Sequence, residues 1–183
     1  MFQSGFSLIQ LLASLVVITM LTLIGVPVLQ ALARTQQQQV MAHDLASALK
    51  FGRLTAVMQE NDVVVRAIDN DWSRGWTIWT DPNGNGEPAH DEPVLLEQRR
   101  HGHVRVVGNT LVKRQVRFIA MGQVAARGAG PGNGTLHICD RREAVSQWRV
   151  IVNVTGRVRI ESGDKAEVLC EVAAVGSRVK AVT

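Results

Sequence analysis

The sequence has 183 residues and a formal net charge of +4, with no Tyr and 16 Gly. This length leaves room for one long helix and one globular domain of ordinary size, which excludes a chain of several such domains.

The first 33 residues carry no charged side chain. Residues 6–33 exceed the roughly 20 apolar residues that cross a bilayer. A secretory signal peptide would have a positive start, a shorter apolar core and a small-residue cleavage site after that core. Here a short polar piece, residues 1–5, precedes the apolar segment. We therefore expect the apolar segment to be retained in the mature chain.

The junction Gly5-Phe6-Ser7-Leu8-Ile9 resembles the prepilin cleavage and methylation site of type IV pilins and type II secretion pseudopilins. The resemblance implies that residues 1–5 are a leader, and that prepilin peptidase cuts between Gly5 and Phe6 and N-methylates Phe6. It also implies that residues 6–33 form a transmembrane and filament helix. That helix would lie in the bacterial inner membrane first, and against other pilins or pseudopilins after assembly.

The N-terminal segment departs from the family pattern in two places. Its leader contains no Lys or Arg, and Gln10 stands where the family has a glutamate. In the family, that glutamate is thought to neutralise the terminal ammonium of a neighbouring subunit. Glutamine offers a hydrogen bond without the charge. Two interpretations are open: a specialised minor subunit, with the filament tip as one candidate location, or a tolerated substitution.

Helical character is expected to continue over residues 34–58. Apolar residues recur there at three- and four-residue spacing, which indicates an amphipathic face. A helix over residues 6–58 would be roughly 80 Å long, and its first half must be buried outside a small domain. Pro27 lies within it and removes an amide donor. The family also has a kink proline here, whereas an ordinary membrane-helix proline is the alternative.

Residues 59–183 are expected to form a periplasmic β-rich domain, which makes the fold class α+β. Short β-branched runs separated by Gly, Pro, Asn and Asp predict antiparallel strands, and Thr155-Gly156 predicts a hairpin turn. The expected strands cover residues 63–65, 76–79, 94–96, 104–107, 116–119, 136–138, 148–154, 157–160 and 168–172. A Gly-rich loop is expected over residues 127–134.

This domain resembles the GspH/FimT/FimU group of minor pilins and pseudopilins. The resemblance rests on Phe51-Gly52-Arg53, Trp72, Gly75-Trp76, Thr135-Leu136-His137-Ile138-Cys139 and residues 149–157. It implies a minor type IV pilin that primes or joins a pilus, with possible participation in DNA uptake. A minor pseudopilin of type II secretion and a DNA receptor of a competence pilus are the two alternatives. We expect the four tryptophans to serve in packing.

The two cysteines, Cys139 and Cys170, both lie in the expected exported domain. An even count in an oxidising compartment favours one structural disulfide, and a reduced thiol pair is the competing interpretation. Neither cysteine belongs to a Cys-x-x-Cys pattern, so the sequence does not favour a redox or zinc site.

Oxygen-bearing side chains at Asp81, Asn83, Asn85 and Glu92 match the spacing of an EF-hand calcium loop. Flanking helices are absent, and Pro82 and Pro88 stiffen the segment. The favoured interpretation is a structural loop with Asx turns, and calcium is the alternative. No other cofactor is expected.

Gly156-Arg157-Val158-Arg159 resembles the basic motif with which FimT-type minor pilins contact DNA. Residues two apart on a strand point the same way, so Arg157 and Arg159 would contact successive phosphates. Arg178 and Lys180 would extend that surface. The alternative is a solvated strand face on which these arginines pair with Glu161 or Asp164.

Charge is unevenly distributed along the domain. Residues 60–97 contain nine acids and two arginines, whereas residues 98–139 contain no acid. This pattern fits subunits packed acidic face to basic face, a polyanion partner, or charges mixed again by folding. His101 and His103 have no evident third ligand, and no nucleophile motif is present. We therefore expect no enzyme activity.

Overall fold

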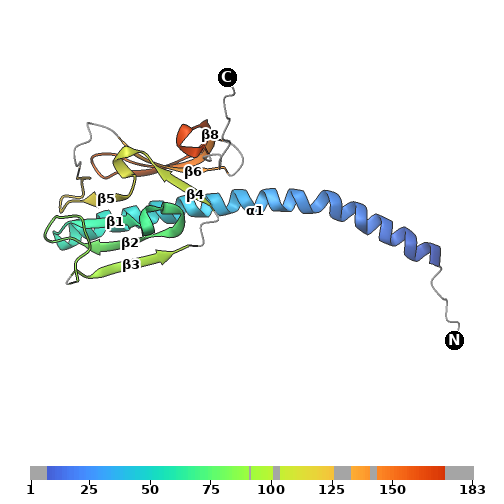
Figure 1. The fold of residues 1–183 in the computed structure, drawn as a ribbon, viewed down its shortest axis with the longest axis horizontal. Coiled ribbons are helices and arrows are strands. Elements are labelled where there is room, and N and C mark those ends of the chain that lie inside the picture. The colour runs from blue at the N-terminus through green and yellow to red at the C-terminus, as the bar shows by residue number, and fades with distance from the viewer. Residues whose placement is uncertain (1–7, 91, 101–103, 126–132, 141–143, 172–183) are drawn as a thin grey trace, which may run out of the picture. The chain divides into compact units, whose positions relative to one another are not determined.

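The computed structural model describes residues 8–171, apart from 91, 101–103, 126–132 and 141–143. The chain forms two compact units, Met1–Gln37 and Gln38–Thr183. Helix α1 (Leu8–Gln59) contributes to both units and runs without interruption through Pro27 (Figure 1). The long helix expected over residues 6–58 is thereby confirmed for its described part.

In the N-terminal unit, large apolar side chains of α1 are exposed at nearly every turn, from Leu8 to Leu32. Within the residues that the structure describes, no helix has the length and apolar content to cross a membrane. The membrane span expected over residues 6–33 stays a prediction.

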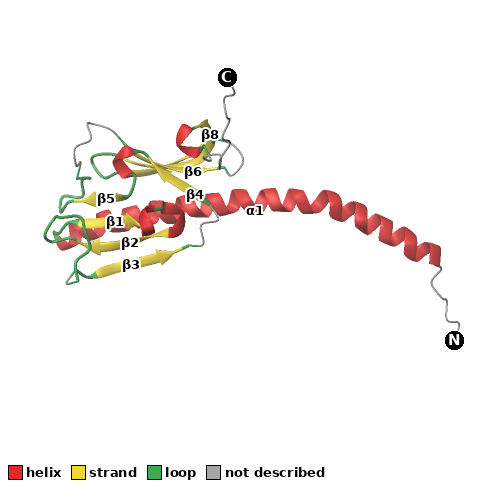
Figure 2. Cartoon of the chain, in the orientation of Figure 1, coloured by secondary structure: helices red, strands yellow, loops and turns green. Residues whose placement is uncertain are grey.

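The C-terminal unit contains two antiparallel four-stranded sheets, which confirms the α+β fold class (Figure 2). The first sheet has the order β3-β2-β1-β5, with β1 (Val63–Ala67), β2 (Gly75–Thr80), β3 (Val94–Arg99) and β5 (Gln115–Phe118). The second sheet has the order β4-β6-β7-β8, with β4 (Arg105–Gly108), β6 (Gly134–Cys139), β7 (Val145–Val152) and β8 (Val158–Ala166).

The second half of α1 packs into the core that both sheets share. Met41, Leu45 and Leu49 recur every four residues on one helix face and are buried. Gly52 lies on the same side and brings the helix close to β1. A Cβ atom at this position would lie 2.7 Å from Cγ2 of Val65. The absence of a side chain at Gly52 therefore sets how closely α1 approaches the first sheet.

A short helix, η2 (Trp72–Arg74), connects the two sheets. The indole Nε1 of Trp72 donates to the carbonyl oxygen of Val112 at 2.9 Å, and the backbone N–H of Val106 donates to Oγ of Ser73 at 2.9 Å. Trp72, Trp76 and Trp79 are buried, which confirms a packing role for three of the four tryptophans. The fourth, Trp148, is half-buried, and its ring centroid lies 6.4 Å from that of His43.

The C-terminal strand expected over residues 168–172 is wrong in its described part. Residues 168–170 form a single 3₁₀ turn, η4 (Val168–Cys170). The carboxylate of Glu167 accepts the N–H of Leu169 at 3.3 Å, and the N–H of Cys170 donates to the Glu167 carbonyl at 2.9 Å. These local bonds satisfy donors that a strand would offer to a neighbour.

The disulfide between Cys139 and Cys170 is confirmed. It joins the end of β6 to η4, with 5.4 Å between the two Cα atoms and a sequence separation of 31 residues. Constraining a loop of this length in the unfolded chain contributes about 3–4 kcal/mol in the chain-entropy treatment. Nη1 of Arg105 also donates to the carbonyl oxygen of Cys170 at 3.1 Å, which fixes the turn on β4.

Candidate functional site

The residues of the expected processing site, Gly5 and Phe6, lie outside the described residues. Gln10 belongs to α1, where its side chain is exposed. Cleavage and methylation stay predictions.

The four candidate calcium ligands lie in one loop between β2 and β3, where they bond to one another and to the loop backbone. Asp81 is fully buried, and its carboxylate accepts the N–H groups of Asn85 at 3.1 Å and Gly86 at 2.8 Å. Nδ2 of Asn83 donates to Oε1 of Glu92 at 2.8 Å. The other carboxylate oxygen of Glu92 accepts the N–H of Ala89 at 3.0 Å.

Arg117 on β5 holds this loop against the first sheet. Its Nη1 donates to the carbonyl oxygen of Gly84 and lies 3.9 Å from Oδ2 of Asp81. Its Nε lies 3.7 Å from Oδ2 of Asp62. These contacts and the Asx turns fit the structural interpretation of the loop. Within the described residues, no group of three or more His, Cys, Asp or Glu side chains is placed to hold a metal ion. Calcium binding stays the untested alternative.

Arg117 also shows how folding redistributes charge. It belongs to the acid-free stretch 98–139 but pairs with Asp62 and Asp81 of the acidic stretch. Arg99 likewise pairs with Glu97 at 2.6 Å. At these positions the sequence asymmetry becomes a set of local ion pairs.

A buried histidine lies next to the disulfide. Nδ1 of His137 is 3.2 Å from Oγ of Ser146, and Nε2 is 3.5 Å from Oε2 of Glu167. Ser146 is fully buried and its hydroxyl donates to the carbonyl oxygen of Trp148. Burial lowers the pKa of His137; the Glu167 carboxylate opposes this, while Arg149 and Lys165 add to it. The uncharged imidazole is therefore the form that the fold favours.

The two described arginines of the proposed DNA motif are both exposed but have different surroundings. Arg157 lies in the turn before β8, where its N–H donates to Oδ1 of Asn153 at 2.8 Å, and its side chain is exposed. Arg159 lies on β8, and its Nε is 3.0 Å from Oε1 of Glu161, as the solvated-face alternative expects. Arg178 and Lys180 lie outside the described residues.

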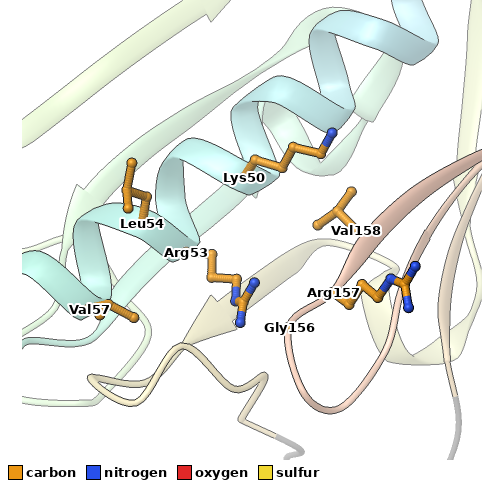
Figure 3. A pocket seen from close by; sticks show the side chains of 7 residues that line it. All are labelled: Lys50, Arg53, Leu54, Val57, Gly156, Arg157 and Val158. Carbon is orange, nitrogen blue, oxygen red and sulfur yellow. The ribbon is translucent and has the colours of Figure 1, made fainter.

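Arg157 instead shares a pocket with two cations of α1 that sequence reasoning did not single out as site residues. We call this the basic pocket (Figure 3). It is lined by Lys50, Arg53, Leu54, Val57, Gly156, Arg157 and Val158. Lys50 and Arg157 are more than a hundred residues apart, so only knowledge of the tertiary fold could have brought them together.

Residues 41–156 match the protein family described as Type II transport protein GspH, which covers well over half of the chain. The fold is also similar to that of the type IV minor pilin FimU of Pseudomonas aeruginosa. One crystal form has a TM-score of 0.58 and 22% identity over 75% of this chain and 98% of FimU. A second has a TM-score of 0.56 and 23% identity over 73% and 99%. A comparison with curated protein sequences gives no match.

Replacing the buried carboxylate of the β2–β3 loop should destabilise the domain without any metal present. In Asp81→Ala, two backbone N–H groups lose a charged acceptor, so we expect a loss of about 2–3 kcal/mol. Urea unfolding followed by tryptophan fluorescence in a chelator measures this loss, and exposed Asp164→Ala is the control. Added calcium should leave the wild-type midpoint unchanged. A calcium-induced rise that requires Asp81 and Glu92 would instead establish the metal interpretation.

Stability should fall as the pH drops below about 6.5, the ordinary pKa of histidine. In this pH range His137 becomes protonated in the unfolded chain but stays uncharged in the folded chain, where its pKa is lowered. Above that pH, the stability that depends on uncharged His137 is fully present. Below it, this residue lowers the free energy of unfolding by at most about 1.4 kcal/mol per pH unit. Urea unfolding between pH 8 and 5 measures it. An equal slope in His137→Gln would refute this assignment.

Proposed function

The chain belongs to the family of the type II transport protein GspH, and on this premise we propose that it is a minor subunit of a type IV pilus. In this proposal, prepilin peptidase removes residues 1–5 and methylates Phe6. Residues 6–33 then anchor the chain in the inner membrane until it enters the filament. The domain that follows lies in the periplasm before assembly, where an oxidising environment keeps the Cys139–Cys170 disulfide closed.

The observation that carries the proposal is the exposure of apolar residues along the first half of α1. Leu8, Leu15 and Leu23 are 79%, 60% and 73% exposed in the single chain. A helix that is apolar on all sides is buried in its working state, either in lipid or among other helices. Joined to a domain of the GspH family, such a helix supports a subunit that packs through α1 with other pilins. The family is structural, and our proposal gives this chain no catalytic role.

Pilus and secretion machines both use subunits of this kind. The similarity to FimU concerns the fold. Because FimU is a minor pilin of a type IV pilus, we favour a role in the pilus over a role in secretion. A minor pseudopilin of type II secretion is the second candidate, supported by the description of the matching family. DNA binding through Arg157 and Arg159 stays a prediction, and the Arg159–Glu161 pair weakens its basis.

The mature chain should begin at N-methylated Phe6. Mass spectrometry of the protein purified from its own bacterium should show the loss of residues 1–5 and one added methyl group. Gly5→Leu places a bulky side chain at the scissile bond and should retain the leader, whereas Ser4→Ala should be processed normally. An intact Met1 in the wild-type protein would rule out the prepilin interpretation.

Deletion of the gene should reduce surface pili and leave protein secretion unchanged. A minor subunit that primes assembly is needed in few copies, so its loss should lower pilus number severalfold. Electron microscopy of the cells and assay of secreted proteins measure the two outcomes, with the wild-type gene supplied in trans as the control. Normal piliation with impaired secretion would assign the chain to the secretion machine instead.

A further inference from the structure

The basic pocket brings three cations that form no ion pair to one place on the described surface. Seven arginines of the domain pair with Asp or Glu: Arg66, Arg74, Arg99, Arg100, Arg117, Arg149 and Arg159. Within the same described residues, Lys50, Arg53 and Arg157 make no ion pair. The same holds for Arg105, Lys113, Arg114 and Lys165, but none of these four lines the pocket. Three unneutralised cations around one concavity produce a positive potential that attracts carboxylates or phosphates.

The guanidinium of Arg53 is held in place before any partner arrives. Its Nε donates to the carbonyl oxygen of Gly122 at 3.0 Å, and its side chain extends from α1 toward the turn that carries Gly156 (Figure 3). Gly156 has a φ of 78°, and a Cβ atom there would lie 2.9 Å from Nε of Arg53 and collide with the Gly122 carbonyl. The two terminal nitrogens of Arg53 make no hydrogen bond within the described residues, so they remain available to a carboxylate.

The lining between the cations is aliphatic. Leu54 and Val57 are 58% and 46% exposed, and Val158 is half-buried. The pocket volume of about 480 Å³ falls within the range of roughly 300–1,000 Å³ found for ligand sites. A small inorganic anion would leave this apolar surface in water. The lining therefore suits a partner that presents carboxylates and aliphatic side chains together.

We propose that the basic pocket binds an acidic, aliphatic segment of a neighbouring subunit in the filament. The identity of the partner rests on the proposed filament role, whereas the chemistry of the pocket does not. This chain itself carries one segment of this kind. On the edge strand β3, Val94 and Leu96 are 57% and 39% exposed next to Glu97, whose carboxylate forms an exposed ion pair with Arg99 in the single chain. A pocket on one subunit and a different surface on the next make a heterologous contact, the type that builds helical filaments.

Nucleic acid fits the pocket less well. The lining contains no aromatic side chain on which a base could stack. Arg159, which would contact the adjacent phosphate, is paired with Glu161 and does not line the pocket. A peptide uses both the cations and the aliphatic surface, whereas a phosphate backbone uses only the cations.

Binding of a labelled peptide to the purified full chain in detergent tests the proposal. The probe is the chain's own segment 92–98, Glu-Pro-Val-Leu-Leu-Glu-Gln. Its binding is measured by fluorescence anisotropy, with empty micelles as the background. We expect at least tenfold weaker binding when Ser replaces its three aliphatic residues, and also when Gln replaces its two glutamates. Lys50→Gln, Arg157→Gln and Leu54→Ser should each weaken binding three- to tenfold.

Arg159→Gln is the matched control, because it removes a neighbouring arginine outside the pocket, and it should change peptide affinity less than twofold. Absence of peptide binding, or binding unaffected by Lys50→Gln and Arg157→Gln, would overturn the proposal. The proposal would also be overturned if a 20-base-pair DNA duplex bound more tightly than the peptide and if both Arg157→Gln and Arg159→Gln weakened that DNA binding. The assay needs neither processing nor assembly, so its failure would leave the filament role intact. Failure of the processing experiment would likewise leave the peptide result standing.

Discussion

The close approach of α1 to the first sheet at Gly52 is the constraint on which the domain depends. Because no side chain separates the helix from Val65 at this point, larger neighbours such as Met41, Leu45 and Leu49 can fill the space between the sheets. The hydrophobic effect then drives a single core made from one helix face and two sheets. The opposite face of the same helix remains exposed, and it supplies one wall of the basic pocket.

Buried polar groups of the domain form hydrogen bonds and ion pairs mainly with nearby groups. In the β2–β3 loop, the buried carboxylate of Asp81 is neutralised by backbone donors and by nearby Arg117. At the other sheet, Glu167 serves both η4 and His137. Buried charge is tolerated where such partners are provided. The cations of the basic pocket are the contrasting case, because none of them pairs with a carboxylate in the described part of the chain.

The sequence was sufficient to predict the helix, the antiparallel domain and the disulfide, since each follows from periodicity, turn residues or an even cysteine count. It was misleading at residues 168–172, where a short apolar run fits a strand as well as a 3₁₀ turn. Only the fold shows that Glu167 closes that turn. The calcium spacing and an Asx-turn loop share the same residue types, so spacing alone does not separate them. The basic pocket depends on the register of α1 against the β7–β8 turn, which no local pattern specifies.

The contact among Arg53, Gly122 and Gly156 has a consequence for how this surface can evolve. Any side chain at Gly156 would strike the Gly122 carbonyl, so the two turns can change only in concert, and the orientation of Arg53 changes with them. Lys50, Leu54 and Arg157 are exposed and bear no such restriction. Substitution at these three positions can therefore change the preferred partner without disturbing the contact that orients Arg53.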